Sequence, residues 1–230
     1  MIADKLAQVH ERIARACAGA GRPVQSVTLL VVTKTFAATA VREAFDAGER
    51  RFGENHVQEG LDKIEALADL RSRLAWHLIG PVQSNKTRLV AERFDWVHSV
   101  DRLKIAERLS AQRPAHLPPL AVCLQVNISG EATKSGFAPG EVAAAAHAVA
   151  ALPRLALRGL MAIPEPAADF DAQRRPHRAL RELFEALRRD GLALDTLSMG
   201  MSDDLEAAIA EGATLVRVGS AIFGGRPHAG

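Results

Sequence analysis

The chain has 230 residues, of which 48% are hydrophobic and 24% are charged, and its formal net charge is +2. This balance predicts a single folded domain over residues 1–230, and without basic blocks interleaved with aromatic residues it argues against a nucleic-acid partner. No apolar run reaches the roughly 20 residues of a membrane span, and the two isolated cysteines predict a reducing, cytoplasmic location.

The first predicted element is a helix over residues 1–19. The stretch is amphipathic rather than organised as a signal peptide, and "GAGRP" follows it with glycine and proline. We expect an extra N-terminal helix packed on the rest of the domain. Its apolar residues recur at steps of three or four and so share one face: Ile2, Leu6, Val9, Ile13 and Cys17.

Short apolar runs then alternate with helical patterns along the rest of the chain. Several runs are apolar on both faces, which is typical of a parallel sheet covered by helices. The alternation most economically closes into a (β/α)8 TIM barrel, and an open doubly wound sheet is the alternative. The predicted strands are 27–34, 50–55, 74–80, 95–100, 120–128, 155–163, 194–200 and 214–219.

Polar residues gather where these strands end, which is the functional face of a barrel. Lys34 closes the first strand, Asn55 follows the second, and His77 lies in the third among apolar neighbours. Lys34 is either a strand-end lysine that reaches a carboxylate or a reactive amine at the barrel mouth. His77 is either a core histidine or a ligand contact.

The last two strand ends favour an anion site. "SMGMSDDLEAAI" leads from a strand through Gly200 into a helix, with Ser202 at the expected N-cap position. "VRVGSAIFGG" places Gly219 and Ser220 similarly after Arg217. Phosphate binding after strands 7 and 8 recurs in barrels because backbone N–H groups are free there. Ordinary helix capping and a tight turn are the alternative explanation.

A lysine that faces a phosphate site suits a ligand with an aldehyde at one end and a phosphate at the other. Pyridoxal 5′-phosphate has this form and is held by lysine in proteins. A class I aldolase acting on sugar phosphates would use the same two features. These residues alone do not separate the two.

Several motifs, taken together, resemble those of the YggS/PROSC family, the pyridoxal phosphate homeostasis proteins. They are "VVTKT", "RFGENHVQEGLDKI", "WHLIGPVQSNK", "SGEATKSGF", "LRGLMAI", "LSMGMSDDLEAAI" and "VRVGSAIFG". The family is similar to the barrel domain of alanine racemases without their second domain, which implies the same barrel here.

The resemblance also implies roles for individual residues. Lys34 would form the internal aldimine with pyridoxal 5′-phosphate, and Arg217 would approach the pyridine nitrogen. Asn55 would lie near the ring. Apart from the resemblance, we predict His77 as a further cofactor contact, with a core histidine as the alternative. The phosphate would be held by Ser202, Gly219 and Ser220.

The sequence departs from the family pattern at a few positions. His56 replaces the tyrosine common after "FGEN", and Phe36 with Ala37 replaces a lysine–proline pair often found after "KT". No family role transfers to these side chains. His56, His77 and His98 do not have the spacing of a metal site, so we expect no metal.

The absence of tyrosine from the chain bears on catalysis. Racemases of the related fold use a lysine and a tyrosine as opposed bases, so a two-base racemase of that design is excluded. An arginine at the pyridine nitrogen also disfavours protonation of that nitrogen and weakens the ring as an electron sink.

We therefore predict a pyridoxal phosphate protein of cofactor homeostasis without strong catalytic activity. It would be a monomer that buffers the cofactor or delivers it to apo-enzymes. The alternatives are a slow single-base racemase and a Schiff-base aldolase.

Overall fold

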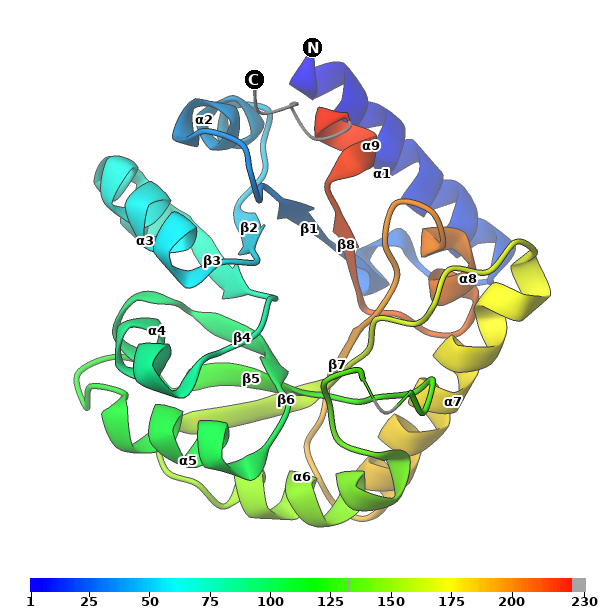
Figure 1. Ribbon diagram of the computed structural model, residues 1–230. Helices are drawn as coiled ribbons and strands as arrows, with labels where there is room; N and C mark the ends of the chain where they lie inside the picture. The colour runs from blue at the N-terminus through cyan, green and yellow to red at the C-terminus, as the bar shows by residue number, and fades with distance from the viewer. Residues whose placement is uncertain (132, 225–230) are drawn as a thin grey trace.

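Eight parallel strands form the centre of the computed structural model, which describes residues 1–131 and 133–224 (Figure 1). Each strand pairs with the next, and β1 also pairs with β8, so the sheet is a closed barrel. The predicted TIM barrel is confirmed, and the open sheet is excluded. The strands are β1 (Thr28–Val32), β2 (Arg51–Glu54), β3 (Ala75–Leu78), β4 (Trp96–Val100), β5 (Leu120–Gln125), β6 (Leu155–Met161), β7 (Thr196–Ser198) and β8 (Leu215–Val218).

Helices surround the barrel and bury its outer face. They are α1 (Ile2–Gly19), α2 (Ala38–Asp46), α3 (Val57–Ala66), α4 (Thr87–Arg93), α5 (Leu103–Gln112), α6 (Val142–Ala150), α7 (Phe170–Arg189), α8 (Leu205–Ala210) and α9 (Ser220–Phe223). Short 3-10 turns lie at Val24–Ser26, Ala68–Arg73, Ser84–Lys86 and Pro139–Glu141. In the described part of the chain, no helix combines the length and apolar character needed to cross a membrane.

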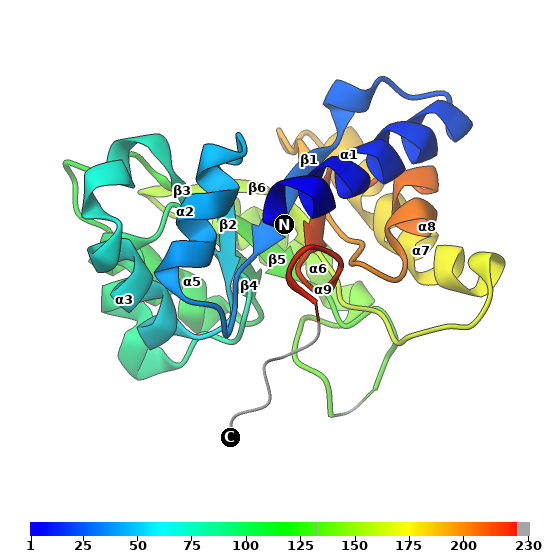
Figure 2. The same cartoon turned by 90° about the horizontal axis from the view of Figure 1, so that it is seen from above.

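The predicted N-terminal helix is present as α1 and lies outside the barrel beside α8 and α9 (Figures 1 and 2). Its buried residues belong to the apolar face expected from the sequence: Leu6, Val9, Ile13 and Cys17. Burying this face stabilises the helix, because an isolated helix of this length is marginal in water.

Several strands end earlier than their apolar runs predict. β1 stops at Val32, so Lys34 lies two residues beyond the strand, in a turn, and does not close it. The carbonyl oxygen of Thr33 accepts hydrogen bonds from Lys63 Nζ at 2.6 Å and from the N–H of Phe36 at 3.1 Å, and not from a neighbouring strand. Thr35 then adopts a positive φ of 67°, which turns the chain away from the barrel.

The main core lies between the sheet and the helices. Inside the barrel, Leu30, Val32, Ile79 and Leu215 form a separate small apolar cluster. Much of the remaining interior is polar, because β3, β4, β7 and β8 carry the buried side chains of His77, His98, Ser198 and Arg217. This polar interior is unusual, since such barrels are generally filled by branched apolar side chains.

Candidate functional site

A cavity of about 550 Å³ opens where the strands end. Six of the seven site residues predicted from the sequence line it: Lys34, Asn55, Ser202, Arg217, Gly219 and Ser220. They come from the ends of β1, β2, β7 and β8 and from the turns that follow. The barrel thus brings residues nearly 190 positions apart to one site. A volume of this size is typical of small-ligand sites.

Lys34 is partly buried in a turn, and hydrogen bonds hold the backbone of the residues on both sides of it. Glu59 accepts a hydrogen bond from the backbone N–H of Thr35, and Lys63 donates to the carbonyl oxygen of Thr33. Lys63 also contacts Glu59 at 2.7 Å, so one pair of α3 side chains anchors both sides of the turn. The backbone at Lys34 is therefore held in place while its side chain faces the cavity.

Beneath this turn lies a buried ion pair. Lys63 Nζ is 2.8 Å from Glu54 Oε1, which also accepts the hydroxyl proton of Thr33. Both side chains are almost fully buried, and Glu54 Oε2 has no hydrogen-bond partner among the described residues. Burial raises the pKa of the Glu54 carboxyl, and Lys63 opposes that rise. Glu54 thus points towards α3 and not into the barrel mouth.

Ser202 differs from its predicted role as a helix cap. α8 begins at Leu205 with Asp204 as N-cap, so Ser202 lies in the preceding turn and the N-cap prediction is wrong. The Asp204 side chain accepts a hydrogen bond from the N–H of Met201 at 2.7 Å and so closes this turn itself. Ser202 Oγ instead accepts from the N–H of Ala221 at 3.3 Å, which links the loop to the first turn of α9.

The N-terminal helix braces this loop from outside the barrel. Arg12 on α1 donates to the carbonyl oxygen of Ser202 at 2.9 Å and to Glu206 at 2.8 Å. Sequence reasoning missed this contact, because nothing in the amphipathic pattern of α1 indicates what its polar residues touch. The extra helix therefore contributes to the position of Ser202.

Gly219 lies where β8 passes into α9 and approaches β1 closely. A Cβ at this position would lie 3.0 Å from the carbonyl oxygen of Val32, closer than most real Cβ contacts. Ser220 follows as the first, exposed residue of α9. On the same side, Phe36 stacks on Phe223 with ring centroids 4.8 Å apart, which joins the Lys34 turn to α9.

Arg217 lines the inner part of the cavity and is only 3% exposed. It donates to Ser198 Oγ at 2.8 Å and to the carbonyl oxygen of Ala162 at 2.9 Å. Burial lowers the pKa of Arg217 to about 10, while the nearby Asp204 carboxylate opposes the shift. The guanidinium remains a cation near neutral pH, and its five N–H groups leave donors beyond these two bonds for a ligand.

Asn55 follows β2 and carries a buried oxygen, Oδ1, without a hydrogen-bond partner among the described residues. Buried polar atoms without partners are uncommon and costly, so this oxygen is available to a ligand. The backbone here is also crowded: a Cβ on Gly80 would lie 2.0 Å from the carbonyl oxygen of Asn55. Only glycine fits at that position.

His77 is not among the residues that line the cavity. It lies deeper in the barrel, 1% exposed, where its ring stacks on Trp96 at 5.2 Å and its Nδ1 is 2.8 Å from His98 Nε2. The structure therefore does not place it as the direct ligand contact that we predicted. It reaches the cavity only through other side chains.

Sequence reasoning missed the apolar part of the cavity wall. Ile163 and Met201 line it and are about 40% exposed. Val32, Phe36 and Ile79 complete the apolar lining. The available signal was the position of Ile163 and Met201 shortly after the ends of β6 and β7, which is the functional face of a barrel.

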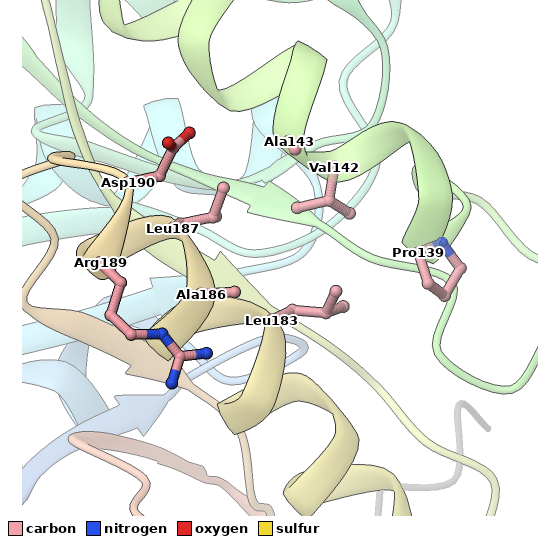
Figure 3. A pocket seen from close by; sticks show the side chains of 8 residues that line it. All are labelled: Pro139, Val142, Ala143, Leu183, Ala186, Leu187, Arg189 and Asp190. Atoms are coloured by element: carbon pink, nitrogen blue, oxygen red, sulfur yellow. The ribbon is translucent and has the colours of Figure 1, made fainter.

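A second pocket, of about 410 Å³, lies between α6 and α7 on the outside of the barrel. Figure 3 shows Val142, Leu183 and Leu187 around it, with Arg189 and Asp190 close by. It shares no lining residue with the mouth cavity. Within residues 1–131 and 133–224, no group of three or more histidine, cysteine, aspartate or glutamate side chains is arranged to hold a metal ion.

The mouth cavity thus combines an amine, a buried cation, hydroxyl groups and an apolar wall. An amine can attack a carbonyl carbon, and hydroxyl and backbone N–H groups can bind a phosphate. The apolar wall suits a flat ring between these two ends. A closed barrel with this mouth defines a protein of the small-ligand-binding (β/α)8 class.

The chain belongs to the family described as "Alanine racemase, N-terminal domain", which matches residues 5–227. The "Pyridoxal phosphate homeostasis protein" of Pseudomonas aeruginosa is 63% identical over 227 residues, covering 99% of this chain and 96% of that protein. The protein of the same name from Escherichia coli K12 is 55% identical over 228 residues, covering 99% and 97%.

Solved structures also resemble this chain. PipY of Synechococcus elongatus, solved with PLP bound, is 37% identical with a TM-score of 0.85, covering 97% of this chain and all of that one. An alanine racemase of Clostridium difficile 630 is 13% identical with a TM-score of 0.78, covering 98% of this chain and 58% of that one. At that identity the likeness concerns the fold alone.

Proposed function

We propose that this protein binds pyridoxal 5′-phosphate and serves in the homeostasis of that cofactor, holding it and handing it on without strong catalytic activity. One observation carries the proposal: Lys34, Arg217 and the Ser202 and Ser220 hydroxyls line a single cavity. The names of the Pseudomonas and Escherichia relatives, and the PLP bound in PipY, support it.

The residues of the cavity fit this cofactor. When bound, pyridoxal phosphate supplies an aldehyde that condenses with an amine, and a phosphate that anchors it. Lys34 would hold the aldehyde end, and the phosphate would lie against Ser202, Gly219 and Ser220. A side chain at Gly219 would crowd Val32, and glycine leaves the backbone here without a side chain of its own beside the phosphate.

Arg217 would face the ring nitrogen, and Asn55 would offer its unpartnered Oδ1 to the ring substituents. Because a buried guanidinium disfavours a second positive charge beside it, the ring nitrogen would stay unprotonated. A pyridine ring whose nitrogen is unprotonated withdraws electrons weakly from a bound substrate. This property favours storage of the cofactor over carbanion chemistry.

The absence of tyrosine supports the same assignment, because Lys34 has no opposing phenol in this chain. We further propose that the chain is one cofactor-binding domain that acts as a monomer. Its partners would be the cofactor and apo-enzymes that receive it. A cytoplasmic location agrees with two buried, unpaired cysteines.

Absorption spectroscopy and cofactor transfer test this function. The protein purified with pyridoxal phosphate is expected to be yellow and to restore activity to an excess of an apo-enzyme. Pyridoxal, which has no phosphate, is expected to bind at least about tenfold more weakly. Turnover of L- or D-alanine at about 1 s⁻¹ or faster would replace the proposal with an enzymatic function.

A further inference from the structure

A row of buried polar side chains crosses the barrel interior below the cavity. It consists of His77 on β3, His98 on β4, Ser198 on β7 and Arg217 on β8, none more than 3% exposed. Of these, only Arg217 lines the cavity. Burying four polar side chains costs free energy unless each finds a partner.

The four side chains form one continuous hydrogen-bonded chain. Arg217 Nη1 is 2.8 Å from Ser198 Oγ, which is 2.7 Å from His98 Nδ1. His98 Nε2 is in turn 2.8 Å from His77 Nδ1. Each distance lies within the range of a normal hydrogen bond.

The arginine fixes the first donor of this chain. Because a guanidinium can only donate, Ser198 accepts the Arg217 hydrogen bond on its oxygen. In the arrangement that gives the serine proton a partner, the hydroxyl donates to His98 Nδ1 and His98 donates from Nε2 to His77 Nδ1. Both neutral rings then carry their proton on Nε2, and the Nε2–H of His77 has no partner among the described residues.

The surroundings keep both rings neutral. Burial lowers the pKa of His77 to about 3, with nearby Arg51 contributing. Burial also lowers the pKa of His98 well below its ordinary value, and His77 and Arg217 act in the same direction. Trp96 stacks on the His77 ring, and Arg158 lies 4.8 Å from the centre of the Trp96 ring.

We propose that Ser198, His98 and His77 are positioning residues that hold the Arg217 guanidinium in one orientation against the ring nitrogen of the bound cofactor. This inference rests on the proposed function. Without Ser198 Oγ, Arg217 would keep only its bond to the carbonyl oxygen of Ala162 and could turn about it. The ring nitrogen would then lose its fixed cationic neighbour and take up a proton more readily.

The test compares four variants with the wild type. Ser198→Ala breaks the chain at the arginine, and His98→Phe keeps a ring of similar shape without polar atoms. His98→Gln is the conservative rescue, because its amide can still accept from Ser198 and donate to His77. Ser110→Ala is the matched control, since it also removes a buried serine hydrogen bond, to Pro153 outside the barrel.

Two properties of the bound cofactor are measured. We expect Ser198→Ala and His98→Phe to weaken pyridoxal phosphate binding about tenfold. We also expect the pH midpoint of its visible absorption to move to lower pH by about half a unit or more, because a protonated ring disfavours a second proton at the lysine-linked nitrogen. His98→Gln and Ser110→Ala should leave this midpoint at the wild-type value.

A cofactor analogue with C–H in place of the ring nitrogen separates positioning from general damage. With this analogue, Ser198→Ala should shift no midpoint, because no ring nitrogen is present. Equal shifts with both cofactors would overturn the inference, as would a Ser198→Ala protein with the wild-type midpoint. Failure of the wild type to bind pyridoxal phosphate would contradict the proposed function instead.

A measurement on the protein without cofactor covers the case in which variants do not fold. Nitrogen-15 NMR of the wild-type histidine rings should find His77 and His98 neutral, with the proton on Nε2. Detection of a proton on Nδ1 of His98, or of a charged ring at neutral pH, would overturn the proposed chain.

Discussion

Replacing Lys63 with methionine tests how the Lys34 turn is held. The substitution keeps an apolar stem of similar length but removes the ammonium that contacts Glu54, Glu59 and the Thr33 carbonyl oxygen. It leaves the fully buried Glu54 carboxyl without a compensating charge. Breaking a buried pair from one side generally costs about 3–5 kcal/mol.

We therefore expect Lys63→Met to lower the free energy of unfolding by about 3–5 kcal/mol, and the melting temperature by roughly 6–20 °C in a domain of this size. Urea unfolding followed by circular dichroism gives the free energy. The double variant Glu54→Gln/Lys63→Met should lose less than the single one, because no buried charge remains unpaired. Lys104→Met, at an exposed position of α5, is the control.

The turn itself gives a second readout. In the variant, the Thr33 carbonyl oxygen loses its hydrogen bond from Lys63, and Glu59, which accepts from the N–H of Thr35, loses its contact with Lys63. We therefore expect Lys63→Met to bind less pyridoxal phosphate at a fixed concentration, even where it is fully folded. A loss of stability below about 1 kcal/mol, typical of surface pairs, would refute the reasoning.

Three further predictions concern other parts of the fold. Ser202→Ala should weaken pyridoxal phosphate binding about ten- to hundredfold in a titration, because it removes a hydroxyl from the phosphate end; unchanged affinity would exclude Ser202 from that site. Gly200→Ala should destabilise the protein by roughly 2–4 kcal/mol in urea unfolding, since its φ is +95° and its Cβ would lie 2.6 Å from Ala208 Cβ. Gly191→Ala, with φ +93° but open space, should cost only about 1 kcal/mol, and equal losses would contradict the packing argument. The pKa of His77 is about 3 in the folded protein and about 6.5 in the unfolded chain, so the free energy of unfolding should fall as pH falls. This residue alone should account for a loss of about 2 kcal/mol between pH 8 and pH 5. A His77→Phe protein whose stability changes with pH as steeply as that of the wild type would contradict this prediction.

The fold follows from the sequence because its signals are local. Alternating apolar runs and helical patterns predicted the barrel, and one apolar face predicted α1. Strand ends were less predictable. Beyond the end of β1, the Thr33 carbonyl oxygen accepts from Lys63 on α3 and from the N–H of Phe36 in the turn that follows. No pattern within β1 shows the contact with Lys63.

The site was predictable to the extent that it lies at strand ends. Lys34 and Arg217 reach the same cavity because the C-terminal ends of parallel barrel strands meet at one mouth. The hydrogen bond between Ser198 and His98 joins residues 100 positions apart, and the contact of Arg12 with the Ser202 loop spans 190 positions. Such partners depend on strand order and register, which spacing along the chain does not reveal.

Borohydride reduction of the yellow protein, followed by peptide mapping, tests the central assignment most directly. Reduction fixes the cofactor on the amine that carries it, so the pyridoxyl mass identifies the lysine without reference to affinity or activity. We expect the mass on the peptide that contains Lys34 and its loss in Lys34→Ala, which should keep its fold because this partly buried side chain lies in a turn at the cavity. A pyridoxyl group found mainly on Lys86 or Lys134, and retained in Lys34→Ala, would contradict the account.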